Sequence, residues 1–245
     1  MASNPPGLCC LKGFKHEGTP EGKTEQIGDI PTYITSPTDI GHAGKAIIFL
    51  SDVFGTSNNG MLLADEFARQ GYLTVYPDLL QGDHLTPDDF FSGSVDMVEW
   101  ASRHGPDAVD PVIEATIDYV RNTLEIKKVA AVGYCFGGKY VARFLRENKL
   151  DSGFTAHPSF MSVEELAGVE KPFAIAAAEH DTIFPQEKRI ESENILRKSK
   201  QRFQINLYSG VSHGFGVRGD LSVPAELFAK EAAFAQAVAW FNSTL

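Results

Sequence analysis

Short apolar runs alternate with longer amphipathic segments along the chain from about residue 45. Apolar runs of this length, bounded by Gly, Pro or Asp, are typical of strands buried in a sheet. They predict strands at residues 45–50, 72–76, 128–132, 152–156, 173–178 and 203–208. The segments between them have helical length and spacing, at residues 60–70, 90–103, 107–124, 136–148, 185–200 and 223–241.

This alternation predicts the α/β class, with a mostly parallel central sheet and helices on both faces. Residues 8–35 carry Ile27, Ile30, Tyr33 and Ile34, which predict an antiparallel hairpin at the edge of the sheet. Neither an internal repeat nor a linker divides the sequence, so we expect residues 1–245 to form a single domain.

Two further local features accompany this pattern. Asp107 or Asp110 is expected to cap the helix over residues 107–124, with Pro111 in its first turn. Residues 78–89 are rich in Gly, Pro and Asp and predict a loop that leaves the sheet.

Residues 133–138 read Gly-Tyr-Cys-Phe-Gly-Gly directly after an apolar run. A strand, a sharp turn and a helix with a nucleophile at the apex form the nucleophile elbow of α/β-hydrolases. The flanking glycines are needed because the strand and the helix approach closely and the apex residue has a strained backbone. The pattern therefore predicts an α/β-hydrolase fold with Cys135 as nucleophile, although a cysteine at a strand end is otherwise most often a core residue.

A thiol nucleophile needs a base, and the base needs a group that orients it. Asp181 follows the predicted strand 173–178, and His213 follows the predicted strand 203–208. Functional residues of open α/β sheets gather at the carboxyl ends of strands, and the order nucleophile, acid, histidine is that of α/β-hydrolases. We predict a Cys135–His213–Asp181 triad, in which His213 accepts the thiol proton and Asp181 holds the imidazole.

Backbone amides are expected to bind the negatively charged oxygen that forms during acyl transfer. One is the N–H of Phe136, the residue after the nucleophile. The other comes from the loop after the strand 45–50, where we favour the N–H of Val53.

Several of these residues also have plainer interpretations. Asp181 could serve only as the N-cap of the helix that begins near Pro185. His213 could be a histidine of a surface loop. His180 is a competing base, and His157 is interpreted as a histidine at the edge of the core. The adjacent pair Cys9 and Cys10 is interpreted as packed or surface cysteines without chemistry.

Aromatic residues flank the predicted site and suggest a pocket for a small apolar or unsaturated ring, although ordinary core packing explains each one equally well. They are Phe54, Phe90, Phe91, Tyr134, Phe136 and Phe215.

Charge and composition narrow the possible partners. The net charge of −10 argues against nucleic acid and anionic membranes as main partners. No secretory signal or apolar run of membrane-spanning length is present, so we expect a cytoplasmic protein whose thiol stays reduced. No metal-ligand spacing occurs, and we expect neither a metal nor another cofactor. The oligomeric state is left open.

Five segments of the chain resemble the dienelactone hydrolase (carboxymethylenebutenolidase) family: residues 52–55, 76–79, 133–138, 179–181 and 212–215. The resemblance runs from about residue 24 to the end of the chain, and residues 5–10 and 16–19 resemble fungal members. It implies a single α/β-hydrolase domain without a cofactor. It also implies hydrolysis of a lactone or ester through an acyl-thiol intermediate, with Cys135, Asp181 and His213 as the triad.

The sequence departs from bacterial members of that family at two places. A family glutamate that contacts the resting thiol corresponds here to Asp52, one methylene shorter, which we expect to restrain Cys135 until substrate binds. Two family arginines grip a substrate carboxylate, but residues 79–83 contain none. Arg218 is therefore the candidate anion contact, with a surface salt bridge as the alternative, and dienelactone itself is expected to be a poor substrate.

The sequence thus predicts a cofactor-free hydrolase for small lactones or carboxylic esters. A thioesterase or esterase of a biosynthetic pathway would carry the same triad and differ only in pocket shape. A non-catalytic binding protein that retained the α/β-hydrolase fold is the alternative outside the enzymes, because fold does not fix function.

The elbow assignment makes one prediction about thiol reactivity. Cys135 should react with iodoacetamide faster than Cys9 or Cys10 near neutral pH, because a helix N-terminus and a neighbouring histidine favour the thiolate. Timed labelling followed by peptide mapping measures this order. Preferential modification of Cys9 or Cys10 would contradict the assignment.

Overall fold

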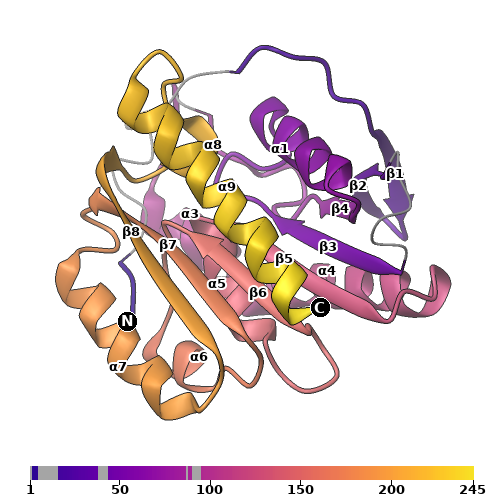
Figure 1. Cartoon of the computed structure of the whole chain (residues 1–245). Coiled ribbons are helices and arrows are strands. Elements are labelled where there is room, and N and C mark those ends of the chain that lie inside the picture. The colour runs from indigo at the N-terminus through magenta and orange to yellow at the C-terminus, as the bar shows by residue number, and fades with distance from the viewer. Residues whose placement is uncertain (1, 5–15, 38–43, 87, 90–94) are drawn as a thin grey trace.

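The computed structural model describes residues 2–4, 16–37, 44–86, 88–89 and 95–245. Within these residues, one eight-stranded sheet runs in the order β1-β2-β4-β3-β5-β6-β7-β8 (Figure 1). The strands are β1 (Lys23–Ile27), β2 (Ile30–Thr35), β3 (Lys45–Leu50), β4 (Leu73–Pro77), β5 (Lys128–Tyr134), β6 (Ser152–Ala156), β7 (Phe173–His180) and β8 (Phe203–Ser212).

The sheet is parallel from β4 to β8, whereas β1 and β2 form an antiparallel hairpin. The predicted edge hairpin is confirmed, and β2 continues the sheet by pairing antiparallel with β4. β3 and β6 have the predicted bounds, while β8 is longer than predicted and ends at Ser212. The expected α/β-hydrolase architecture is therefore the observed one.

Helices connect the strands in the order expected from the sequence. They are α1 (Asn58–Arg69), α3 (Met97–Arg103), α4 (Pro106–Asp118), the π-helical turn η2 (Tyr119–Thr123), α5 (Phe136–Phe144), α6 (Val163–Ala167), α7 (Gln186–Ser199), α8 (Phe215–Arg218) and α9 (Pro224–Thr244). The predicted caps of the helix after residue 105 are wrong. Gly105 is the N-cap and Pro106 takes the first turn, which leaves Pro111 inside the helix.

Helices cover both faces of the sheet (Figure 1). α1 and α9 bury their apolar residues on one face, around Phe49, Tyr76 and Phe154. α4 and α5 pack on the other face, with Ile113 and Val141 in the second core. The strands read as continuous apolar runs because both of their faces are buried.

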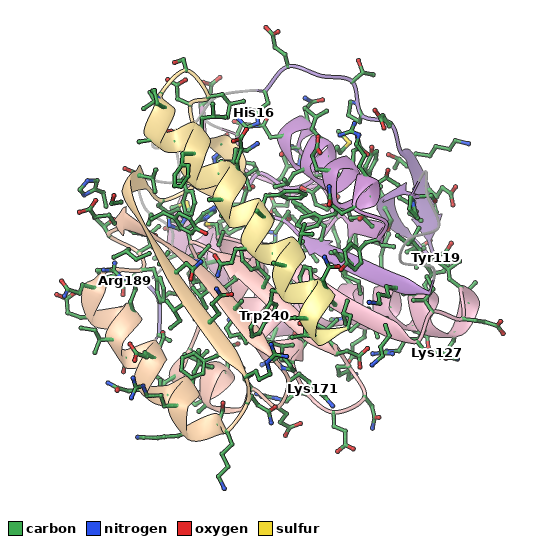
Figure 2. All side chains as sticks on the ribbon, in the orientation of Figure 1. His16, Tyr119, Lys127, Lys171, Arg189 and Trp240 are labelled. Atoms are coloured by element: carbon green, nitrogen blue, oxygen red, sulfur yellow. The ribbon has the colours of Figure 1, made fainter. Side chains whose placement is uncertain are left out.

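Side chains fill the space between the helices and the sheet (Figure 2). Trp240 of α9 is only 7% exposed and belongs to the core beneath that helix. Near the opposite end of α9, two polar contacts hold His16 (Figure 2). Its amide donates to Asn59 Oδ1 in α1 at 2.9 Å, and its Nε2 lies 3.0 Å from the carbonyl oxygen of Gly219.

The turn between β5 and α5 depends on two glycines. A Cβ atom on Gly133 would lie 2.6 Å from the Gly137 carbonyl, and one on Gly137 would lie 2.2 Å from the Leu50 carbonyl oxygen. Both contacts are far closer than packed atoms allow and involve backbone that cannot move aside. The structure thus bears out the expectation that glycine is needed on each side of the elbow.

Candidate active site

Cys135 occupies the apex between β5 and α5 with φ 50° and ψ −108°, a strained conformation for a residue with a side chain. Such strain costs about 1–3 kcal/mol and persists only where surrounding contacts hold it. Here the Cys135 amide donates to the Ala156 carbonyl at 3.2 Å, and the Cys135 carbonyl accepts from Ser159 N at 2.9 Å. The side chain is fully buried.

Asp181 and His213 form a buried pair where β7 and β8 end. His213 Nδ1 lies 3.0 Å from Asp181 Oδ2 and 3.1 Å from Oδ1. Asp181 Oδ1 also accepts the amides of Ile183 and Phe184, at 2.8 and 3.0 Å. Asp181 therefore caps a turn, but not the helix α7 suggested by its position, because the N-cap of α7 is Pro185.

These contacts set the protonation state of Asp181. Burial by itself raises the pKa of this carboxyl group. The hydrogen bond and the charge of His213, together with the two amides, outweigh burial and hold the pKa below its ordinary value of 3.8. The carboxylate is thus ionised at neutral pH and favours His213 with the proton on Nδ1, which leaves Nε2 as the basic nitrogen.

Two short connections join Cys135 to this pair. Ile183, two residues after Asp181, forms a small buried apolar cluster with Cys135. The Cys135 amide donates to the Ala156 carbonyl, and the next residue is His157. The centroid of the His157 ring lies 4.8 Å from the centroid of the His213 ring. The three residues predicted as a triad therefore belong to one buried neighbourhood.

His157 is buried completely and packs between His213, Tyr134 and Phe215. Burial lowers its pKa well below 6.5, and the nearby His213 charge lowers it further, while Asp181 acts in the opposite direction. His157 is therefore a neutral ring behind His213 at neutral pH, in keeping with its interpretation as a residue at the edge of the core. His180, the competing base, is instead exposed and lies 3.8 Å from Glu179.

Ser159 is a site residue that sequence reasoning missed. Its hydroxyl oxygen lies 3.4 Å from Cys135 Sγ, and its side chain is fully buried. A hydroxyl at this distance can donate to a thiolate and so favour the ionised sulfur. No motif in the sequence marks Ser159, because its contact depends on how the chain turns after β6.

The two amides expected to bind an oxyanion lie in neighbouring turns. Phe136 is the first residue of α5, where a backbone N–H has no partner within the helix. The next amide, that of Gly137, donates to the Ser51 carbonyl at 2.9 Å. This bond joins the start of α5 to the loop after β3, which contains the buried Val53.

Asp52 and Arg218 form an ion pair beside this loop, with side chains only 4% and 12% exposed. Asp52 Oδ1 also accepts the Phe54 amide at 2.9 Å, and the Arg218 guanidinium lies 4.6 Å from the centre of the Phe54 ring. The alternative of a salt bridge for Arg218 is therefore the arrangement observed, but the pair is largely buried and does not lie on the surface. The carboxylate proposed to restrain Cys135 is held by Arg218 and by the Phe54 amide.

The aromatic residues divide into two groups. Tyr134, Phe136 and Phe215 are each about 2% exposed and pack in the cores, whereas Phe54 is partly exposed. Phe90 and Phe91 lie outside the described residues, as do Cys9 and Cys10.

No group of three or more His, Cys, Asp or Glu side chains among the described residues is arranged to hold a metal ion. Among the helices of the described ranges, none combines the length and apolar character needed to cross a membrane.

The Asp181–His213 contact predicts how stability depends on acid. A carboxyl group whose pKa is depressed by folding stabilises the protein above its ordinary pKa, and this contribution is lost as pH falls below about 4. Asp181→Asn should lower the free energy of unfolding at pH 7 by about 1.5–3 kcal/mol, as for a lost hydrogen bond to a charged group. Urea denaturation from pH 7 to pH 3 should show a shallower acid loss in the variant than in the wild type. An equal loss of stability with falling pH in the two proteins would contradict the prediction.

Comparisons with known proteins agree with this architecture. Residues 30–245 match the model of the dienelactone hydrolase family. The chain is 46% identical to hydrolase pyvD of Aspergillus violaceofuscus, over 100% of this chain and 99% of the relative. It is 32% identical to dienlactone hydrolase 1 of Gibberella moniliformis, over 99% of this chain and 95% of the relative. The crystal structure of a dienelactone hydrolase from Anabaena variabilis shares the fold, with TM-score 0.64 and 15% identity over 94% of this chain and 100% of that one. The chain therefore belongs to the dienelactone hydrolase family.

Proposed function

We propose that this hydrolase cleaves small lactones or carboxylic esters through a Cys135–His213–Asp181 triad and an acyl-thiol intermediate. The observation that carries the proposal is the buried Asp181–His213 pair, 3.0 Å apart, beside a cysteine held at a strained elbow. Membership of a family of lactone and ester hydrolases supports the reaction class. The mechanism follows from what each group can do.

In the first half-reaction, His213 takes the thiol proton of Cys135 and the thiolate attacks the substrate carbonyl carbon. The carbonyl oxygen becomes an oxyanion, for which the amides of Phe136 and Val53 are the proposed donors. Collapse of this intermediate breaks the C–O bond and leaves the acyl group on sulfur. His213 returns its proton to the departing alkoxide, which stays tethered to the acyl group when the substrate is a lactone.

In the second half-reaction, His213 removes a proton from water and the resulting hydroxide attacks the thioester. The C–S bond breaks, the carboxylic acid leaves and the thiol regains its proton from His213. Throughout, the Asp181 carboxylate keeps the imidazole in one orientation and stabilises its charged form. Ser159 supports the thiolate by donating a hydrogen bond from 3.4 Å.

The charge beside the site favours an uncharged substrate. Arg218 is already neutralised by Asp52, so the pair presents no net positive charge to a carboxylate. The family resemblance implies two arginines for an anionic substrate, and the first has no counterpart in residues 79–83. We propose that the partly exposed Phe54 ring, with Arg218 behind it, contacts the body of a neutral substrate.

Loss of the nucleophile should abolish turnover. Cys135→Ala should lower kcat for p-nitrophenyl acetate by roughly 10³-fold or more, because the variant lacks the thiol that is proposed to form the acyl intermediate. A double Cys9→Ser, Cys10→Ser variant is the matched control and should keep wild-type rates. Stopped assays with mass spectrometry should also detect an acyl adduct on Cys135.

Two outcomes of that assay would count against the mechanism. Equal turnover by wild type and Cys135→Ala would leave a binding role for the fold. Turnover lost in the Cys9, Cys10 control would place the chemistry elsewhere.

The Asp52–Arg218 pair makes a prediction about substrate charge. Wild-type kcat/KM should be higher for the methyl ester of a carboxylate-bearing lactone than for the free acid. Asp52→Asn keeps an acceptor for the Phe54 amide but leaves the charge of Arg218 uncompensated. The variant should therefore shift the ratio of the two kcat/KM values toward the acid by about tenfold, which corresponds to about 1.4 kcal/mol. The ratio cancels any general loss of activity. A wild-type preference for the acid would refute the neutral-substrate proposal.

A further inference from the structure

The first described residues of the chain lie against the candidate active site. Ala2 and Ser3 are fully buried. Figure 1 shows this short indigo segment near the marker N, running up to the loop between β7 and α7. We refer to residues 2–4 as the strap.

One side of the strap binds the loop after β6. Ser3 N donates to the Met161 carbonyl at 2.9 Å, and the Met161 amide donates back to Ser3 Oγ at 2.8 Å. The Phe160 amide donates to the Asn4 carbonyl at 2.9 Å. Residues 160 and 161 directly follow Ser159, whose hydroxyl contacts the Cys135 sulfur.

The other side of the strap binds the turn after β7. Asn4 N donates to the Ile183 carbonyl at 2.7 Å, and Asn4 Nδ2 donates to the Thr182 carbonyl at 3.1 Å. Thr182 and Ile183 directly follow Asp181, and Ile183 packs on Cys135. The strap therefore bridges the two segments that present Ser159 and Asp181 to the rest of the site.

Neither segment has a sheet partner of its own at this point. The β6–β7 ladder pairs residues up to Ala156 and Ala176, and the β7–β8 ladder ends at His180 and Ser212. Phe160 and His157 have φ values of 57° and 41°. Non-glycine residues in this region persist only where neighbouring contacts hold them. Five hydrogen bonds to the strap supply such contacts beyond the end of the ladder.

We propose that Ser3 and Asn4 are positioning residues of the active site, which hold the Ser159 and Asp181 segments at the spacing that Cys135 and His213 require. This inference rests on the proposed thiol mechanism. Errors of about 1 Å in the placement of reacting groups can cost about 10²-fold in rate. The strap thus acts on kcat through two loops and touches no reacting atom.

The test removes one or two strap bonds at a time from the whole chain, with Cys9 and Cys10 replaced by serine so that Cys135 alone is labelled. Asn4→Ala removes the bond to the Thr182 carbonyl, and Asn4→Pro also removes the amide donor to Ile183. Ser3→Ala removes the acceptor for the Met161 amide. Asn122→Ala is the matched control, because Asn122 Nδ2 donates to Asp118 Oδ1 at 2.7 Å at an exposed position.

We expect Asn4→Pro to lower kcat for p-nitrophenyl acetate roughly tenfold while KM changes little, with smaller losses in Asn4→Ala and Ser3→Ala. The pH midpoint of Cys135 alkylation by iodoacetamide should move upward, because a displaced Ser159 no longer stabilises the thiolate. Asn122→Ala should change neither quantity.

Several results would overturn the proposal. One is wild-type kcat and wild-type alkylation profiles in all three strap variants, alongside an inactive Cys135→Ala. Another is a lower melting temperature with unchanged kcat at a temperature where every variant is folded, because residues 2–4 would then be purely structural. Activity retained by Cys135→Ala would remove the thiol mechanism and the strap's role with it.

Discussion

The close approach of α5 to the end of β3 governs the rest of the site. Gly137 lies against Leu50 and donates its amide to the Ser51 carbonyl, leaving no room for a side chain. This contact lies beside the sharp turn that gives Cys135 its strained backbone, where α5 starts at Phe136. It also joins the elbow to the loop that carries Val53 and Asp52. One backbone contact therefore links the proposed nucleophile and both proposed oxyanion donors to the loop that carries the ion pair.

Each buried carboxylate of the site has a partner that can carry positive charge, and the whole chain carries −10. Asp181 faces His213, and Asp52 faces Arg218, in each case with little exposure to solvent. Buried charges are costly unless a partner and hydrogen bonds compensate them. The Asp181 carboxylate meets this condition with two backbone amides as well as the imidazole. His157 adds no charge, because its burial keeps it neutral.

The fold was largely predictable because its signals are local. Apolar runs gave β3 and β6 their bounds, and glycines on both sides of Cys135 marked the elbow. The positions of Asp181 and His213 followed from a general rule, since loops at the carboxyl ends of parallel strands share one edge of the sheet. The cap of α4 was missed because three residues, Gly105, Asp107 and Asp110, competed within one short stretch, and the proline at position 106 decided the start.

The contacts that could not be predicted join residues far apart in the sequence. Asp52 and Arg218 are 166 positions apart, and the sequence around either residue does not indicate that the other is its partner. The same holds for Ser159 beside Cys135 and for Asn4 beside Thr182. Each pairing depends on the path of a loop beyond the last strand pair, where side-chain periodicity carries no information. Sequence patterns thus predict the edge of the sheet at which the active site lies. The paths of the loops determine which side chains contact one another there.

Burial of the site has a further physical consequence. Cys135 exposes none of its surface, and His213 only 2%. Excluding water strengthens the interaction of Asp181 with an imidazolium and of the amides with an oxyanion. The same burial requires the atoms over the sulfur to move before a carbonyl carbon can reach it. The segments beyond the ends of β6 and β7 are among the parts of the site that no strand pairing holds. Their hydrogen bonds to residues 3 and 4 therefore add order that strand pairing alone does not give.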